Sequence, residues 1–313
     1  MKFTEFGFDD RLMESIEALG YKEATPIQQQ AIPFIMQGHD LLGSAQTGTG
    51  KTAAFLLPVI NNIITSPPGN GLKAMVIVPT RELAVQIDQQ MEGFSYFTPV
   101  SSMAIYGGTD GITFEREKQA LTEGADVVIC TPGRIIAHFN QGYVNVSELK
   151  YLILDEADRM LDMGFYDDIM KIVSFLPENR QNIMFAATMP KDIGVLARKT
   201  LVNPKEVNIS ISKPAEKILQ VAYSVYDSQK IPLTIHTLNS KNIKSVLIFC
   251  STKNSTKQLS RELKHAGLKV AEIHSDLDQK TREEVMLSFR NHQTTVLVAT
   301  DIVSRGIDVE DID

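Results

Sequence analysis

Short apolar runs recur along the chain, separated by stretches in which apolar residues are spaced as on one face of a helix. The runs that predict strands are Asp40–Ser44, Ala74–Pro79, Met103–Tyr106, Val127–Cys130, Tyr151–Leu154, Asn182–Ala186, Val221–Tyr226, Ser245–Cys250, Val270–His274 and Thr295–Ala299. Helical stretches such as Arg81–Met91 lie between them. Such alternation is typical of parallel sheets that helices cover on both faces. The pattern therefore predicts an α/β fold.

The alternation of strands and helices occurs in two successive series. Residues 204–217 separate the series and contain two prolines and many polar residues without a regular period, which is typical of a linker. A chain of 313 residues is also longer than one domain usually is. We therefore predict two parallel-sheet domains, residues 1–209 and 210–313. The second series has fewer strands than the first, so we expect the second sheet to be incomplete at its C-terminus.

Composition narrows the class of protein. No apolar run reaches the roughly 18 residues that a membrane-spanning helix needs, and the acidic segment Met1–Asp10 lacks the pattern of a secretion signal. We therefore expect a cytoplasmic protein without a membrane partner. The net charge is −7, which argues against a protein that holds a polyanion by its overall charge. Any polyanionic partner would have to be held by local basic clusters.

The segment Ala45-Gln-Thr-Gly-Thr-Gly-Lys-Thr52 follows a predicted strand and precedes a predicted helix. In this context a glycine-rich turn presents backbone N–H groups to phosphates at the N-terminus of the helix. Gly48 and Gly50 would allow the backbone to turn. Lys51 would reach the β- and γ-phosphates, and the Thr52 hydroxyl would ligate Mg²⁺. The usual pattern begins with glycine where this chain has alanine, so the segment matches a variant form.

Three acidic residues follow the predicted strand Tyr151–Leu154, in the segment Asp155-Glu-Ala-Asp158. The carboxyl ends of parallel strands are where α/β sheets bind ligands. Asp155 would hold Mg²⁺ directly or through water, and Glu156 would polarise an attacking water as general base. Acidic residues also begin solvated helices, but the phosphate loop upstream favours a nucleotide site. The predicted catalytic residues are therefore Lys51, Asp155 and Glu156.

These motifs and their order resemble those of the DEAD-box ATP-dependent RNA helicases, and the resemblance extends from Phe3 to Asp313. It implies two tandem RecA-like domains that bind ATP, Mg²⁺ and RNA, as a single strand or short duplex, without sequence preference. ATP and RNA would bind across a cleft between the domains. Closure would bend one RNA strand and separate a few base pairs, and hydrolysis would reset the open form. We expect the chain to be a monomer.

The resemblance assigns the ATP contacts to particular residues. Gly20–Gln28 is similar to the adenine-reading Q motif, in which Gln28 would pair with the adenine edge and Phe3 would stack on the base. ATP is therefore expected rather than GTP, and the chain has no guanine-reading Asn-Lys-x-Asp sequence. The expected nucleotide-binding residues are Phe3, Tyr21, Thr25, Gln28, Ala45, Gln46, Thr47, Gly48, Thr49, Gly50, Lys51, Thr52, Gly306 and Asp308, and the expected metal ligands are Thr52 and Asp155.

The same resemblance assigns RNA contacts to loops that follow predicted strands. Pro79–Ala84, Gly107-Gly108 and Thr131–Arg134 are similar to the RNA-facing motifs of the first domain. Leu247–Thr252, His274–Arg282 and Ala299–Asp308 are similar to the family's later motifs, in the second domain. The expected RNA-binding residues are Pro79, Thr80, Arg81, Gly108, Thr131, Arg134, Gln279, Arg282 and Thr300. Such contacts would fix the RNA backbone and read no sequence.

The residues expected to couple ATP to RNA are Asp158, Ala186, Thr188 and Arg305. Two departures from the family pattern limit the expected activity. Ala186 stands where the family has serine, so one hydroxyl that would help tie the Asp155–Asp158 loop to the cleft is missing. The family's H-R-x-G-R-x-x-R element, which supplies arginine to the transferring phosphate, would follow Asp313. We therefore expect this chain to bind ATP but to hydrolyse it poorly.

Other functions also fit the sequence. An ATP-dependent RNA clamp would grip RNA without unwinding it, and the alanine at position 186 is compatible with this alternative. A DNA translocase of the same superfamily would hydrolyse ATP in response to DNA. A phosphate-loop kinase or GTPase is disfavoured by the doubled α/β pattern and by the missing guanine-reading sequence.

Restoring the hydroxyl with Ala186→Ser is expected to increase strand separation more than ATP hydrolysis. The reason is that a hydrogen bond to a charged partner contributes about 1.5–3 kcal/mol. Strand-displacement and ATPase assays of the chain and the variant measure the two activities side by side. An unchanged unwinding rate would show that this hydroxyl does not limit the coupling.

Overall fold

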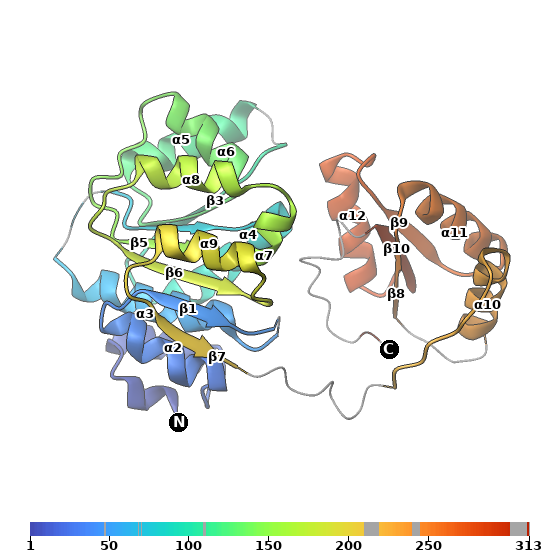
Figure 1. The fold of residues 1–313 in the computed structure, drawn as a ribbon, viewed down its shortest axis with the longest axis horizontal. Helices are drawn as coiled ribbons and strands as arrows, with labels where there is room; N and C mark the ends of the chain where they lie inside the picture. The colour runs from blue at the N-terminus through green and yellow to red at the C-terminus, as the bar shows by residue number, and fades with distance from the viewer. Residues whose placement is uncertain are drawn as a thin grey trace. The chain divides into compact units, whose positions relative to one another are not determined.

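The computed structural model describes residues 1–46, 48–67, 69, 71–108, 111–209, 219–239, 245–300 and 312. The chain divides into two compact units, Met1–Ala215 and Glu216–Asp313 (Figure 1). The predicted boundary between residues 209 and 210 lies a few residues before this division. Each unit has its own parallel sheet and its own hydrophobic core, as the sequence pattern predicts.

A sheet of seven strands forms the centre of the first unit, in the order β3-β4-β2-β5-β6-β1-β7 (Figure 1). The strands are β1 (Leu41–Ser44), β2 (Ala74–Ile77), β3 (Ser102–Ile105), β4 (Val127–Cys130), β5 (Tyr151–Leu154), β6 (Gln181–Ala186) and β7 (Lys205–Asn208). Every neighbouring pair is parallel. All seven strands therefore place their carboxyl ends along one edge of the sheet.

Helices cover both faces of this sheet. The helices are η1 (Phe3–Phe6), α1 (Asp10–Ala18), α2 (Pro26–Met36), α3 (Lys51–Thr65), α4 (Arg81–Ser95), α5 (Gly111–Glu123), α6 (Pro132–Asn140), α7 (Ala157–Asp162), α8 (Tyr166–Phe175) and α9 (Lys191–Thr200). The first five pack on one face with strand residues such as Val76, and the other five pack on the opposite face with residues such as Met75. Burial on both faces explains why the strands are continuous apolar runs.

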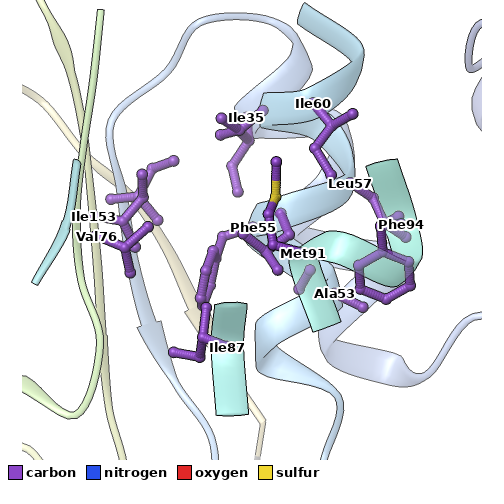
Figure 2. Packing of buried hydrophobic residues seen from close by; sticks show 14 of the residues in the cluster. Ile35, Ala53, Phe55, Leu57, Ile60, Val76, Ile87, Met91, Phe94 and Ile153 are labelled. Atoms are coloured by element: carbon purple, nitrogen blue, oxygen red, sulfur yellow. The ribbon is translucent and has the colours of Figure 1, made fainter. Parts of the chain in front are cut away.

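Helix α3 is buried along most of its length. Figure 2 shows its side chains among residues of α2, α4 and the strands, with the Phe55 ring pointing toward the side where Val76, Ile153 and Ile87 lie. The Phe55 ring centroid lies 5.8 Å from that of Phe185 on β6. Because this packing holds α3 against the sheet, the first turn of the helix, which follows the phosphate loop, is fixed in place.

Three parallel strands, in the order β8-β10-β9, form the sheet of the second unit within its described residues. The elements of this unit are α10 (Asp227–Asn239), β8 (Val246–Cys250), α11 (Lys253–His265), β9 (Val270–Ile273), α12 (Gln279–Arg290) and β10 (Val296–Thr300). The central strand β10 is buried throughout. Val298 packs with Leu263 of α11, and Leu297 packs with Phe289 of α12. Among the described residues of either unit, no helix combines the length and the apolar character that crossing a membrane requires.

Two sequence predictions about the strands are wrong. Strand β7 lies within the predicted linker; it is polar, buries only Val207 and pairs with β1 alone, so the hydrophobic pattern does not reveal it. Conversely, the predicted strand Val221–Tyr226 has no regular structure, and Tyr226 is 80% exposed. Its alternating apolar residues suit a half-buried surface, but nothing in the described part of the chain covers them.

Replacing Phe55 with alanine tests the packing of α3. Phe55→Ala is expected to lower the free energy of unfolding of the first unit by about 3–5 kcal/mol, because a fully buried ring is lost and a cavity remains. Because the chain has no tryptophan, urea unfolding is followed by circular dichroism to measure the change. The control Ile112→Ala removes a side chain that is 68% exposed and should change the free energy by less than about 0.5 kcal/mol.

Candidate functional site

The strand order sorts the predicted motifs into two neighbouring groups. Strands β5, β6 and β1 are adjacent, and their carboxyl ends lead into Asp155–Asp158, Ala187-Thr188 and the phosphate loop. Strands β3, β4 and β2 are also adjacent, and they lead into Gly107-Gly108, Thr131 and Pro79-Thr80. The predicted nucleotide residues and the predicted RNA residues of the first unit therefore occupy adjoining halves of one sheet edge.

The backbone of the phosphate loop depends on two glycines. Gly48 and Gly50 have φ angles of 80° and 89°, in the left-handed region that glycine adopts without strain. Gly50 is also the N-cap of α3, and a Cβ atom there would clash with the Gln28 amide nitrogen. The Thr49 hydroxyl donates a 2.7 Å hydrogen bond to the Gln46 carbonyl. The loop therefore leads into the N-terminus of α3, where unpaired N–H groups favour an anion; Thr47 lies outside the described residues.

Lys51 carries a buried ammonium group that makes no hydrogen bond with the described residues. The side chain is 7% exposed, and its Nζ atom has no hydrogen-bond partner among the described residues. Burying an ammonium group without a partner costs free energy, so such a group favours binding of an anion. The residues present therefore fit a nucleotide whose phosphates Lys51 would contact. Thr52, the next residue of α3, is half-buried.

Asp155 is 3% exposed at the end of β5. Burial is the main cause that raises the pKa of its carboxyl to about 6; Lys51 opposes this shift, whereas Glu156 and Asp158 add to it. The electrostatic effect of Lys51 on Asp155 shows that the two predicted residues lie close together. Among the described residues, no group of three His, Cys, Asp or Glu side chains is arranged to hold a metal. A magnesium ion held by one carboxylate, a threonine hydroxyl and phosphate oxygens would still suit this donor set.

Glu156 adopts an unusual backbone conformation at the N-cap of α7. Its φ of 52° and ψ of 47° place it in the left-handed region, which costs a residue with a side chain about 1–2 kcal/mol. Its backbone N–H donates to Asp155 Oδ1 at 2.9 Å, and its carboxylate accepts from Arg159 Nη1 at 2.8 Å. The segment thus turns sharply after Asp155, and Arg159 holds the Glu156 carboxylate in a defined position.

Hydrogen bonds join the acidic loop to neighbouring strands. The Asp158 carboxylate accepts from the Thr188 backbone N–H at 2.9 Å and from its hydroxyl at 2.8 Å. Thr188 therefore supplies a tie despite the alanine at position 186, which is buried at the end of β6. The backbone N–H of Asp155 donates to the Ile77 carbonyl of β2 at 3.1 Å. The loop is thus bonded on both sides.

The predicted adenine-reading residues lie beside the phosphate loop. Gln28 is buried on α2; its amide nitrogen donates to the Gly50 carbonyl at 3.1 Å, and its amide oxygen accepts from the Thr25 N–H at 2.9 Å. Phe3 is 1% exposed because its ring packs against Phe6 and Tyr21. Stacking of adenine on Phe3 would require these contacts to open, and it stays a prediction. Pairing of Gln28 with adenine stays a prediction.

The predicted RNA residues of the first unit gather at the ends of β2, β3 and β4. The guanidinium of Arg81 lies directly over Gly108, where a Cβ atom would overlap it, and Gly108 has a φ of 83°. Thr80 caps α4, since its hydroxyl accepts from the Leu83 N–H at 3.4 Å. Thr131 is the N-cap of α6. The structure thus brings Arg81 and Gly108 into contact although 27 positions separate them.

Arg134 has partners that sequence reasoning missed. Its Nε–H donates to Glu117 at 2.7 Å, and its guanidinium lies over the Phe114 ring at 4.6 Å from the centroid. Glu117 also contacts His138. If Arg134 contacts an RNA phosphate, its guanidinium has to do so while it also contacts Glu117 and Phe114. The sequence gives only a weak signal for this contact. Glu117 resembles any acidic residue on a helix unless the packing of α5 against α6 is known.

The predicted residues of the second unit are only partly described. Thr300 is buried at the end of β10, and its hydroxyl has no hydrogen-bond partner among the described residues. Arg282 on α12 donates from Nη2 to the Ser275 carbonyl at 3.1 Å. The Gln279 side chain and the residues Arg305, Gly306 and Asp308 lie outside the described part, so the structure does not test them.

Comparisons with known proteins match both units. Residues 25–195 match the family model described as DEAD/DEAH box helicase, and residues 229–313 match the model described as helicase conserved C-terminal domain. The chain is 38% identical over 312 residues to the ATP-dependent RNA helicase CshA of Listeria monocytogenes. It is 37% identical over 312 residues to the ATP-dependent RNA helicase DeaD of Klebsiella pneumoniae. These alignments cover 99% of this chain, 59% of the first relative and 48% of the second, so the chain spans about half to three fifths of their length.

Solved structures of similar fold agree with this match. A DEAD box protein from the hyperthermophile Methanococcus jannaschii has a TM-score of 0.63 at 35% identity, with 100% of this chain and 83% of that chain covered. Saccharomyces cerevisiae Dbp5 bound to RNA and ADP BeF3 has a TM-score of 0.85 at 26% identity, with 100% and 79% covered. The match of 171 consecutive residues to one family model, the Asp-Glu-Ala-Asp segment and the two parallel-sheet units together show that the chain belongs to the DEAD/DEAH box helicase family.

Proposed function

We propose that the chain acts as an ATP-dependent RNA helicase, in which the first unit binds Mg²⁺-ATP and grips an RNA backbone. The observation that carries the proposal is the convergence of the buried Lys51 ammonium with Asp155 and Glu156 at the carboxyl ends of three adjacent strands. The Lys51 Nζ atom is buried and makes no hydrogen bond with the described residues, so it can still bind an anion.

Each residue of the site has a distinct role in this proposal. Lys51 contacts the β- and γ-phosphates, and the N-terminal N–H groups of α3 offset their negative charge. Thr52 and Asp155 hold Mg²⁺, which when bound neutralises charge on the phosphates. Glu156 accepts a hydrogen bond from the attacking water and orients it. The Glu156 carboxylate accepts from Arg159, whereas Asp155 Oδ1 accepts from the Glu156 N–H, so the two carboxylates have different partners and can take different roles.

The RNA half of the sheet edge completes the proposal. Arg81 and Arg134 supply positive charge, while Thr80, Gly108 and Thr131 offer hydroxyl and backbone groups at the ends of adjacent strands. Such groups bind the sugar-phosphate backbone and read no sequence. In the second unit, Thr300 and Arg282 would add contacts. The two relatives named above are called ATP-dependent RNA helicases, which supports RNA as the partner.

Binding of a non-hydrolysable ATP analogue is expected to raise the affinity for RNA about 5- to 150-fold, the range that a coupling free energy of 1–3 kcal/mol gives. Fluorescence anisotropy of a labelled oligouridine, with and without the analogue, measures the effect. An oligodeoxythymidine of the same length tests the DNA translocase, and a strand-displacement assay separates a helicase from a clamp. Equal RNA affinity in both conditions would overturn the proposal.

Replacing Lys51 with methionine is expected to weaken ATP binding about 10- to 150-fold, since a charge-assisted contact of about 1.5–3 kcal/mol is lost. The variant should remain folded but lose the positive charge that opposes the raised pKa of the buried Asp155 carboxyl. Titration calorimetry and urea unfolding measure the two effects. The control Lys73→Met breaks the 2.8 Å ion pair with Asp126 and should lower stability without changing ATP affinity.

Replacing Asp155 with asparagine is expected to stabilise the protein without ligand at neutral pH. The folded-state pKa of about 6 lies above the ordinary value of 3.8, so ionisation of Asp155 disfavours the fold. The protonated Asp155 carboxyl contributes its full stability below about pH 4, and this contribution is lost as the pH rises through 6. Asp155→Asn should therefore add up to about 3 kcal/mol at pH 8 and nothing below pH 4. Urea unfolding across this pH range measures the difference in stability between the variant and the parent. A difference that does not change with pH would contradict the raised pKa of Asp155.

A further inference from the structure

A buried polar cluster joins α5 to α6 beside the predicted RNA residues. The face of α5 that carries Phe114 and Glu117, three positions apart, meets the face of α6 that carries Arg134 and His138, four positions apart. Glu117 is 1% exposed and His138 is completely buried. Glu117 Oε2 accepts from Arg134 Nε at 2.7 Å and contacts His138 Nε2 at 2.9 Å.

The hydrogen-bond roles within this cluster follow from the chemistry of each group. A carboxylate only accepts, so His138 must carry a hydrogen on Nε2 and donate it to Glu117. In the neutral ring, Nδ1 then accepts from the hydroxyl of Tyr143, which lies next to it. Burial, followed by the charges of Glu115 and Glu117, raises the pKa of Tyr143, so its hydroxyl stays protonated. The hydrogen bonds from Tyr143 to His138 and from His138 to Glu117 therefore end on Glu117 Oε2, which also accepts from Arg134.

Aromatic contacts fix the same cluster from the sides. The Phe114 ring stacks on the His138 ring with centroids 4.3 Å apart and an angle of 12° between the planes. The Arg134 guanidinium lies over Phe114, and its side chain is 14% exposed. A buried carboxylate needs a cation as well as hydrogen-bond donors. Glu117 therefore holds the guanidinium in one orientation, while Phe114 limits its motion.

We propose that Glu117 is a positioning residue for RNA binding, which acts by orienting Arg134 and the adjoining N-terminus of α6. Arg134 lies in the first turn of α6, whose N-cap is Thr131, so an anchored Arg134 also anchors this turn. The planar guanidinium then meets a phosphate in a prepared geometry and loses little side-chain entropy on binding. The inference rests on the proposed function, because it concerns the RNA contacts of the same site.

A double-mutant cycle tests whether Glu117 acts through Arg134. Glu117→Ala, Arg134→Ala and the double variant are compared with the parent by anisotropy of labelled oligouridine, in the presence of a non-hydrolysable ATP analogue. We expect Glu117→Ala to weaken RNA binding about tenfold, which corresponds to about 1.4 kcal/mol. In the Arg134→Ala background the same change should have little further effect, because the group that Glu117 orients is already absent.

Nucleotide affinity separates positioning from a general loss of structure. The cluster lies between α5 and α6, and α6 follows β4 on the RNA half of the sheet edge, so ATP binding should be the same in all four proteins. Glu117→Gln should recover most of the RNA affinity, because an amide oxygen can accept from both Arg134 and His138. Additive losses in the cycle, or parental RNA binding by folded Glu117→Ala, would overturn the inference.

Arg134→Lys decides the question if Glu117→Ala does not fold. Lysine keeps the positive charge but lacks the planar donors that Glu117 and Phe114 hold in place. We expect this variant to lose RNA affinity about as strongly as Arg134→Ala, whereas parental affinity would show that charge alone matters and would overturn the inference. A parent chain that binds no RNA would instead refute the proposed function, so the two failures remain distinguishable.

Discussion

The first unit depends on keeping two opposite charges buried at the edge of an apolar sheet. The Lys51 ammonium lacks a hydrogen-bond partner among the described residues, and the Asp155 carboxyl has a raised pKa although Lys51 is near. Neither charge therefore fully compensates the other. Packing of α3 and β5 in the hydrophobic core must offset the cost of this arrangement. A ligand with phosphates and a divalent cation would relieve both groups at once.

Much of this architecture follows from the sequence, because parallel strands buried on both faces leave unbroken apolar runs. The carboxyl ends of such runs locate Lys51, Asp155 and Arg81 without knowledge of their contacts. What the pattern does not give is strand pairing. Strand β7 is polar, yet β1 accepts it as a neighbour, and the apolar segment Val221–Tyr226 remains exposed among the described residues.

Local motifs also do not reveal which side chains are already engaged. Phe3 and Gln28 stand at the positions that the family resemblance assigns to adenine, but the structure gives both of them partners inside the first unit. Arg134 stands in an RNA-facing motif, but its orientation depends on Glu117, a residue of a different helix. Contacts between elements that are distant in sequence decide these cases, and no spacing rule encodes them.

The backbone hydrogen bond between Asp155 and Ile77 places the two halves of the sheet edge in direct mechanical contact. Strand β2 ends at Ile77 and continues through Val78 and Pro79 to Thr80 and Arg81. If the acidic turn moved when the Asp155 carboxylate gained or lost a cation, the movement would be transmitted to the end of β2, which is followed by Arg81. In the proposed function, the nucleotide half and the RNA half of the sheet edge therefore belong to strands that are paired directly, β5 with β2.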